Sequence, residues 1–268
     1  MIKVKKIVKK IPGTIILYTF LRKVISFALY FGNKYTCPVC KKSFRKFLPA
    51  CVSEATVIYE KNVIGGGQRE NSLCPYCNST ERLRLEYLYL QKHTNIFDTK
   101  NKVLHFAPEH GFEWLFRKSK NIDYLSGDIE KGCAMYVVDI TEICFDDNEF
   151  DFVICNHVLE HVFDDKKAFE EIQRVLRPGG LVVITVPISL NSATTIETPT
   201  TSDKERLELY GQKDHFRLYG MDFSARLMSA GFDVTTYNAK DNISTELINK
   251  YLLLEMETIF IGKKGRSS

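Results

Sequence analysis

The chain has 268 residues, which is room for one large domain or for a medium domain with a small appendage. With 44% hydrophobic and 26% charged residues it can bury a core, which excludes a disordered chain. The formal net charge is +4, but residues 1–53 hold twelve Lys and Arg and no acid, so residues 54–268 carry −8. This division excludes a uniform polycation that wraps nucleic acid over its whole surface, and it places any bound polyanion at the N-terminal fifth.

Residues 1–34 are predicted to form a basic amphipathic helical arm, interrupted at Pro12 and Gly13. Arg22 and Lys23 divide its apolar stretch into two runs of eight residues, whereas a bilayer span needs about twenty. The arm suits docking on an anionic membrane surface, and packing on the protein's own body or on another subunit is an equal alternative. Because no signal-peptide cleavage site follows, we expect a cytoplasmic protein whose arm can contact the inner face of the membrane.

Residues 35–100 are predicted to form a zinc-binding module and a linking helix. Two C-x-x-C pairs can each present two sulfurs to one Zn²⁺ from a tight turn. The four predicted metal ligands are Cys37, Cys40, Cys74 and Cys77. Such a closed site is structural, and the metal would stabilise a module too small to fold alone. Four unrelated thiols are the alternative, and Cys51 could replace one ligand.

Between and after these pairs, the sequence predicts two further elements. Residues 55–59 are strand-like. Ser79 or Thr80 can cap a helix that runs to about Lys92.

From Lys102 onward, short apolar strands alternate with amphipathic helices. The predicted strands are 102–106, 123–127, 136–138, 152–155, 181–186, 232–237 and 258–262. The predicted helices are 112–119, 166–176 and 221–230, with a long polar loop at 188–219. This pattern predicts an α/β fold with a mainly parallel, seven-stranded Rossmann-like sheet covered on both faces, with an antiparallel edge formed by the last two strands.

In such a sheet the ligand binds beyond the carboxyl ends of the strands, near the point where the strand order reverses. Asp128 and Asp139 follow the second and third predicted strands, and an acid in the first of these positions suits the two hydroxyls of a ribose. The G-x-G-x-x-G pattern that admits a pyrophosphate is absent after the first strand. The sequence therefore favours a nucleoside ligand without phosphate over NAD or FAD.

The runs VLHFAPE (103–109), GD (127–128), VVDITEICFDDNEFDFVICNHVLEHVFDD (137–165) and RVLRPGGLVVITVP (174–187) resemble class I S-adenosylmethionine-dependent methyltransferases of the type 11 group. The two CPxC pairs, ER-x-R-L and GQKDHFRLYG are similar to bacterial methyltransferases often found with surface-polysaccharide genes. The resemblance implies a methyltransferase domain over residues 101–268. H-F-A-P-E replaces the usual D-x-G-x-G at the first turn, where Ala107 is small enough for a close approach.

The resemblance also implies roles for cofactor-binding residues. Asp128 should bind the ribose hydroxyls, Asp139 the adenine amino group, and the Ile140 N–H should lie near the ring. Phe106, Ala107, Pro108 and Glu109 should line the methionine end, with Asn156 and His157 beside the sulfonium. For both aspartates the alternative is a local role, ending a strand or capping a turn.

Transfer to a hydroxyl requires a base as well as proximity. His215 and His161 are the candidate catalytic bases, with Asp214 or Glu197 orienting His215, and Arg217 is the candidate anchor for an anionic acceptor, with Asp214 also near the acceptor. The alternative for His215 is a surface hydrogen bond, and for His161 a contact that braces the start of a helix.

Three functions compete. The first is O-methylation of a small-molecule or glycan acceptor, in particular a glycan or glycolipid intermediate; oxygen is favoured by elimination, because 156–159 lacks the Pro-Pro-aromatic turn of base N-methylation. The second is RNA methylation, with Phe44, Phe47 and the basic run 41–46 in the zinc module as the RNA clamp. The third is a non-catalytic scaffold, suggested by the missing glycines.

Overall fold

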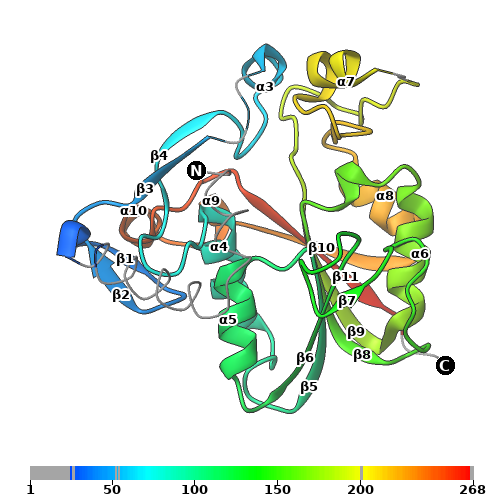
Figure 1. Ribbon diagram of the computed structural model, residues 1–268, viewed down its shortest axis with the longest axis horizontal. Coiled ribbons are helices and arrows are strands. Elements are labelled where there is room, and N and C mark those ends of the chain that lie inside the picture. The colour runs from blue at the N-terminus through cyan, green and yellow to red at the C-terminus, as the bar shows by residue number, and fades with distance from the viewer. Residues whose placement is uncertain (1–24, 26–27, 52, 54, 200–201, 266–268) are drawn as a thin grey trace.

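The computed structural model describes residues 25, 28–51, 53, 55–199 and 202–265 (Figure 1). Most of the predicted arm at 1–34 lies outside the described residues. Its last four residues, 31–34, belong to strand β1 (Phe31–Cys37), so this part of the arm is strand and not helix. Across the described part of the chain, no helix is long and apolar enough to cross a membrane.

The centre of the fold is a seven-stranded mixed sheet, as the sequence predicts. Its strands are β5 (Asn101–Phe106), β6 (Ile122–Asp128), β7 (Tyr136–Val137), β8 (Phe150–Asn156), β9 (Leu176–Thr185), β10 (Phe232–Asn238) and β11 (Thr258–Lys264). The strand order is β10-β11-β9-β8-β5-β6-β7. Strands β5 to β9 pair in parallel, whereas β11 is antiparallel to both β9 and β10. The expected antiparallel edge is confirmed, with β10 outermost.

The middle strands are apolar because both of their faces are covered. Val103 and Leu104 of β5, and Val153 and Ile154 of β8, are fully buried although successive side chains point to opposite faces. From β5 the chain continues outward to β6 and β7 and then returns to β8 on the other side of β5. The strand order therefore reverses between β5 and β8, and this reversal opens a crevice at the carboxyl ends of these strands.

Helices cover the two faces in layers (Figure 1). Helices α4 (Glu81–His93) and α5 (His110–Lys118) pack on one face, and α6 (Asp165–Val175) and α8 (Phe223–Ser229) on the other. Thr80 caps α4 by accepting a hydrogen bond from the Leu83 N–H, which confirms one of the two expected caps. Helix α6 buries Phe169 and Ile172 on a single stripe, as its periodicity predicts.

Two predicted segments differ in the structure. Residues 55–59 were expected as a strand but lie in helix α3 (Thr56–Glu60), because Val57 and Ile58 pack against Tyr210 in a small separate core. The expected long loop at 188–219 contains helix α7 (Asp203–Tyr210), whose packing against α3 is visible at the top of Figure 1.

Local signals for the extra helices are present in the sequence. Ser202 and Glu205 form a reciprocal capping box at the start of α7. Helices α9 (Ala239–Asn242) and α10 (Thr245–Tyr251) lie between β10 and β11, capped by Asn238 and Ser244. Helix α10 packs against β1, so the connection between β10 and β11 contacts the cysteine module.

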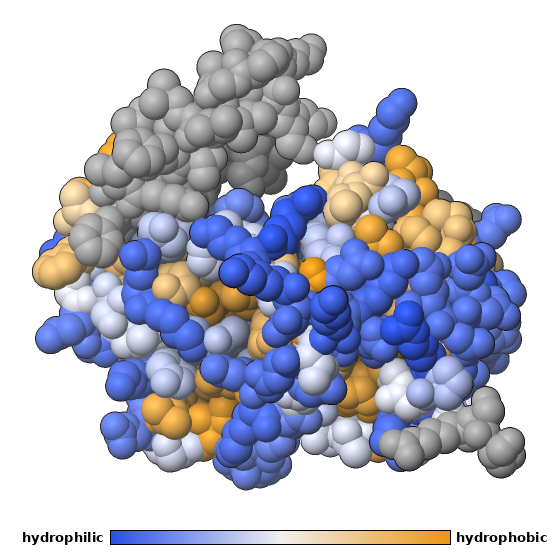
Figure 2. All heavy atoms as spheres, turned by 90° about the horizontal axis from the view of Figure 1, so that it is seen from below, coloured by the Kyte–Doolittle hydropathy of each residue, from blue (hydrophilic) through white to orange (hydrophobic). Residues whose placement is uncertain are grey.

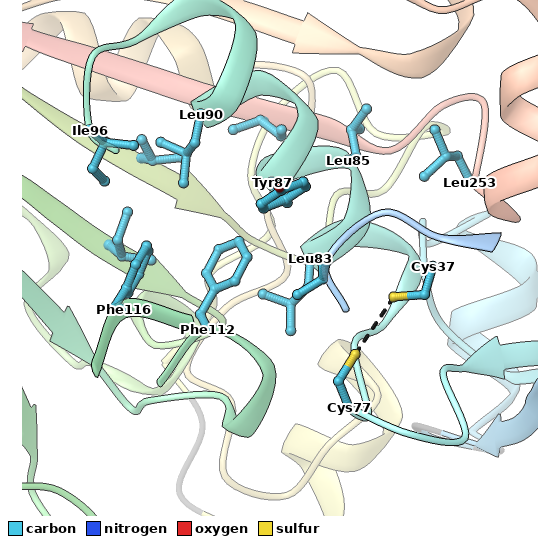
Figure 3. Close-up of a cluster of buried hydrophobic side chains, with 14 of the residues drawn as sticks. Cys37, Cys77, Leu83, Leu85, Tyr87, Leu90, Ile96, Phe112, Phe116 and Leu253 are labelled. Carbon is cyan, nitrogen blue, oxygen red and sulfur yellow. Dashed lines mark hydrogen bonds between the residues drawn. The ribbon is translucent and has the colours of Figure 1, made fainter. Parts of the chain in front are cut away.

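The cysteine module contains two small two-stranded antiparallel sheets. One pairs β1 with β2 (Lys42–Phe44), and the other pairs β3 (Leu48–Cys51) with β4 (Gln68–Leu73). One continuous apolar cluster runs from Cys37 and Cys77 through Leu83 of α4 to Phe112 and Phe116 of α5 (Figure 3). The module therefore shares its core with one face of the central sheet, through α4.

The outer surface seen from below carries mostly hydrophilic side chains, with hydrophobic ones in small separate patches (Figure 2). The described chain thus directs its large apolar area inward, where the sheet and its two helical layers meet.

Candidate cofactor and metal sites

The four predicted cysteine ligands come together. The Sγ atoms of Cys37 and Cys77 are 3.6 Å apart, and those of Cys40 and Cys74 are 3.7 Å apart. A disulfide would need about 2.05 Å, whereas four sulfurs about 2.3 Å from one Zn²⁺ lie about 3.8 Å from each other. All four sulfur atoms lie close enough together to bind one metal ion. The donor set and its spacing fit a closed tetrahedral zinc site.

A hydroxyl group and a buried, positively charged side chain lie beside the four thiols. The Ser79 hydroxyl lies 3.2 Å from Cys37 Sγ and 3.3 Å from Cys77 Sγ. Arg84 is fully buried and donates to the carbonyl oxygens of Ser72 and Ser79, each at 2.8 Å. Its positive charge lies near the thiols, where it would offset the negative charge of a four-thiolate metal site.

A cavity of about 290 Å³ lies in the crevice at the strand reversal. Its lining residues come from the loops after β5, β6, β7 and β8, and they are Phe106, Ala107, Gly127, Asp128, Ile129, Val138, Asp139, Ile140, His157, Val158, His161 and Val162. Six of the nine predicted cofactor residues are among them. Pro108, Glu109 and Asn156 are not.

Two hollows of about 380 and 430 Å³ lie elsewhere, one near the amino ends of β5 and β6 and one between β1 and β2. The smaller cavity is the candidate site because it is the one at the carboxyl ends of parallel strands, where ligands of such sheets bind.

The two aspartates of this cavity also have local partners. Asp128 Oδ1 accepts a hydrogen bond from the Glu130 N–H at 2.7 Å. Asp139 Oδ1 accepts from the N–H and hydroxyl of Thr141 at 2.8 and 2.7 Å. The turn-capping role that was the alternative for both residues is therefore present, and it positions each carboxylate at the cavity wall.

Two loop residues of the cavity have left-handed backbone conformations. Ala107, after β5, has a φ of 44°, and His157, after β8, has a φ of 51°. Residues other than glycine rarely adopt this region, and such strain concentrates at functional sites. Ala107 thus takes, at the first turn, the kind of conformation that a glycine would adopt without strain.

Glu109 lies just behind this turn, among polar residues of three elements. It is 2.9 Å from His105 Nε2, and its Oε1 lies 3.9 Å from Arg82 Nε. Neither Glu109 Oε1 nor Arg82 Nε, both buried, has a hydrogen-bond partner in the described chain. Burial raises the pKa of Glu109, but the hydrogen bond and charge of His105 outweigh it and lower that pKa. The Glu109 carboxylate and the Arg82 guanidinium together could bind the positive and the negative end of a zwitterionic group.

Asn156 is buried at the end of β8. Its Nδ2 donates to Glu86 Oε2 at 2.7 Å, and its Oδ1 accepts from the Thr185 hydroxyl at 2.8 Å. Burial, together with the charge of Glu109, raises the pKa of Glu86 well above its usual value. The side chain expected beside the sulfonium is thus held behind the cavity wall. The sequence reasoning missed Arg82 and Glu86, although Arg82 stands in the ER-x-R-L run.

The two candidate bases contact each other, and one of them, His161, lines the cavity. The rings of His161 and His215 pack edge to face with centroids 4.6 Å apart. His215 is buried, and this burial lowers its pKa to about 4. Asp214 was expected to orient His215, but it contacts His161, whose Nδ1 is 3.2 Å from the Asp214 carbonyl oxygen and 3.4 Å from its carboxylate.

Arg217 has a structural role in place of the expected acceptor contact. It is buried and donates to Glu197 at 3.0 Å, to the Leu159 carbonyl at 3.0 Å and to the Phe163 carbonyl at 2.8 Å. It also donates to the Val162 carbonyl. Glu197, the other residue expected to orient His215, pairs with Arg217 and Arg226 instead. These contacts fasten the loop after α7 to the turn after β8.

The aromatic side chains expected to stack RNA bases are not available for stacking. Phe44 and Phe47 are buried in the module core, 5.9 Å apart between ring centroids. The ammonium groups of Lys41 and Lys42 lie over the rings of Tyr87 and Tyr76. The structure therefore removes the aromatic part of the RNA clamp.

Comparisons with known proteins agree with this architecture. Residues 96–184 match the family model described as "Methyltransferase domain". The chain is 43% identical over 42 residues to phosphoethanolamine N-methyltransferase 2 of Caenorhabditis elegans, covering 16% of this chain and 10% of that protein. It is 44% identical over 46 residues to the demethylmenaquinone methyltransferase of Clavibacter sepedonicus, covering 17% of this chain and 19% of that protein.

Among solved structures, the [4+2]-cyclase SpnF matches with a TM-score of 0.46 and 13% identity, over 69% of this chain and 81% of that one. The chain spans less than a fifth of the length of each of the two curated relatives. The matched residues hold β5 to β9, the strand reversal and most of the cavity wall. Over residues 96–184 the chain is therefore similar to the methyltransferase domain family.

Proposed function

We propose that this protein transfers the methyl group of S-adenosylmethionine to an oxygen atom of a glycan or glycolipid intermediate. The observation that carries the proposal is the cavity at the strand reversal, whose lining includes Asp128 and Asp139 together with His161, the neighbour of His215. The reaction joins the methyl carbon to the acceptor oxygen as the carbon–sulfur bond breaks, and it releases S-adenosylhomocysteine and the hydroxyl proton.

The residues that line the cavity, and two residues behind its first turn, fit this cofactor part by part. Asp128 would accept from the ribose hydroxyls, and Asp139 with the Ile140 N–H would bind the adenine edge. Phe106 and Ala107 would line the methionine chain. Glu109 Oε1 and Arg82 Nε are the buried, unpartnered atoms that would bind the ammonium and carboxylate of its amino-acid end.

The proposed class of acceptor rests on residues in and around the turn after β8. Cys155 is buried in β8, and burial raises its pKa well above the usual value, which argues against a cysteine nucleophile and so against carbon-5 methylation of pyrimidines. Phe163, next to the cavity residue Val162, is exposed and packs edge to face on Phe216. An exposed aromatic face beside the cavity suits the apolar face of a sugar ring. His161 and His215 are the candidate bases.

We also propose that Cys37, Cys40, Cys74 and Cys77 hold one structural Zn²⁺. The tetrahedral sulfur spacing, the Ser79 hydroxyl and the buried Arg84 support this assignment. The ion would connect two small sheets that are too short to form a core of their own.

A labelled-methyl transfer assay tests the function. The full chain is incubated with methyl-labelled S-adenosylmethionine and separate glycan, lipid-linked and RNA fractions. We expect label in the glycan or lipid-linked fraction, stable to base as an ether is, and lost in the Asp128→Ala variant. Label in the RNA fraction alone, or no label with any fraction, would contradict the proposal.

A further inference from the structure

Three side chains beside the cavity form a cluster of potential metal ligands. One donor atom each of Glu160, His161 and His215 lies within 4.8 Å of the other two. Glu160 and His161 belong to the 3₁₀ turn η1 (Leu159–His161), directly after β8, and His215 lies in the loop after α7. The Phe216 N–H donates to the Glu160 carbonyl at 2.8 Å, so the backbone holds this loop against the turn.

Glu160 and His215 of this cluster are buried, and polar atoms of both side chains lack hydrogen-bond partners in the described chain. Glu160 is 1% exposed and His215 is 2% exposed. In the described chain, neither ring nitrogen of His215 has a hydrogen-bond partner, and Glu160 Oε2 has none either. Burying such groups unsatisfied costs about 1–3 kcal/mol each, and native proteins contain few of them. The charged contact of Glu160 is with His157, whose Nδ1 lies 3.1 Å from Glu160 Oε1.

We propose that Glu160, His161 and His215 bind one divalent cation of the first transition row. Two imidazoles and one carboxylate are a ligand set for such ions, whereas Mg²⁺ and Ca²⁺ prefer oxygen ligands alone. With bonds of about 2.0–2.2 Å, ligand atoms on one ion lie at most about 4.4 Å apart. Small side-chain rotations would bring the three donors from their present spacing onto the ion.

Three protein ligands leave coordination positions open, as in catalytic sites and unlike the four-thiolate site. His161, together with His157, lines the cofactor cavity, so we expect an open position of the ion to be reachable from this cavity and from a methyl acceptor bound there. This last point rests on the proposed function: an acceptor oxygen bound to the ion would lose its proton more readily. His161 and His215 would then act as ligands and not as bases. The binding of the ion itself does not depend on methyl transfer.

The test uses the full zinc-loaded chain and Mn²⁺ alone as the probe. Mn²⁺ favours carboxylate and imidazole over thiolate, so the cysteine site does not compete for it. The unbound aqueous Mn²⁺ signal in electron paramagnetic resonance is followed during a titration. We expect one equivalent of Mn²⁺ to bind, and pulsed measurements on the wild type to show nitrogen couplings from imidazole ligands.

Glu160→Gln and His215→Ala should each weaken Mn²⁺ binding at least tenfold. The matched controls Glu170→Gln, on the exposed side of α6, and His93→Ala, at the end of α4, should bind as the wild type does. An unchanged aqueous signal throughout the wild-type titration would overturn the proposal. So would wild-type affinity in Glu160→Gln, or bound Mn²⁺ without nitrogen couplings.

The nitrogen couplings are measured on the wild type, so they decide the question even where a variant does not fold. Binding of S-adenosylmethionine, measured separately by calorimetry, distinguishes the two proposals. A chain that binds Mn²⁺ through imidazoles but does not bind the cofactor supports this site and removes the proposed function.

Discussion

The carboxylate of Glu86 accepts a hydrogen bond from Asn156 Nδ2 at 2.7 Å, and this contact joins α4 to the carboxyl end of β8. Both side chains are buried, and they are separated by 70 positions in the sequence. The helix that follows the cysteine module therefore supplies part of the wall behind the cofactor cavity. Changes in the module should reach the cavity through this helix.

Replacing Glu86 tests that connection. The raised pKa of Glu86 means that burial favours its protonated form. Glu86→Gln, which resembles that form, should change the free energy of unfolding by less than about 1 kcal/mol, whereas Glu86→Ala should lower it by about 2–3 kcal/mol because Asn156 loses its acceptor. Urea unfolding measures both. Equal losses in the two variants would contradict a role for the hydrogen bond.

The ribose contact is tested at Asp128. Asp128→Asn should weaken binding of S-adenosylmethionine by about 10- to 100-fold, because each hydrogen bond to a charged group contributes about 1.5–3 kcal/mol. Isothermal calorimetry measures the affinity. Asp123→Asn, an exposed position on the same strand, is the matched control and should bind as the wild type does. Wild-type affinity in Asp128→Asn would remove this residue from the cofactor site.

Metal analysis tests the four-cysteine site. We expect the four-cysteine site to retain one zinc ion per chain after dialysis, and Cys37→Ser or Cys74→Ser to lose one equivalent of zinc relative to the wild type, together with a melting temperature lower by 10 °C or more, on the order of the contribution of a structural metal. Cys133→Ser, at an exposed position, is the control and should keep both the metal and the stability. A folded wild type free of metal would refute the assignment.

The first turn makes a backbone prediction. Ala107→Gly should bind the cofactor as the wild type does, since glycine adopts a φ of 44° without strain. Ala107→Val should lower the free energy of unfolding by about 1–2 kcal/mol and weaken cofactor binding, because a β-branched residue is an outlier in this region. Ala225→Val, exposed on α8, is the control for the added methyl groups. Equal behaviour of Ala107→Val and this control would contradict the strain.

The pH dependence of stability is tested at Glu257, whose pKa burial raises to about 7, against the opposing charge of Arg82. Between about pH 4.5 and 7 the unfolded chain releases this proton while the folded chain keeps it. The free energy of unfolding should therefore fall with rising pH in this window, by on the order of 3 kcal/mol at most.

Glu257→Gln should remove that slope and unfold at higher urea concentration than the wild type above pH 7. Glu255→Gln, exposed two residues earlier, should keep the slope. Urea midpoints measured from pH 4.5 to 8.5 decide the matter, and a slope unchanged in Glu257→Gln would show that this carboxyl is not its source. Glu81 and Arg69 also face Glu257 and must be kept intact in the comparison.

Local rules predicted the elements whose signals are local. The apolar runs of β5 and β8, the stripe of α6 and the Thr80 cap of α4 each follow from side chains a few residues apart, and all are in the structure. The C-x-x-C spacing likewise predicted one site for the four sulfurs, because each pair can supply two of the four ligands of a tetrahedral metal ion.

The misassigned segment 55–59 shows where such rules fail. Val57 and Ile58 favour a strand locally, but contact with Tyr210 of α7 buries them as a helix. Arg217 and Asp214 lie in the loop after α7, and their partners come from the turn after β8, some 55 residues earlier. Those partners decide that Arg217 is structural.

The sequence by itself determined the α/β class, the seven strands, the acids at their ends and the four-cysteine set, because periodicity and short spacings encode them directly. Only the tertiary structure decided that Arg82 and Glu86 lie behind the cofactor cavity and that Glu160 lies beside His161 and His215. It also decided that the basic segment 1–53 ends in a module that shares the core of the sheet. These relationships join distant segments, and burial, which local sequence does not specify, sets the charge and the partners of each group.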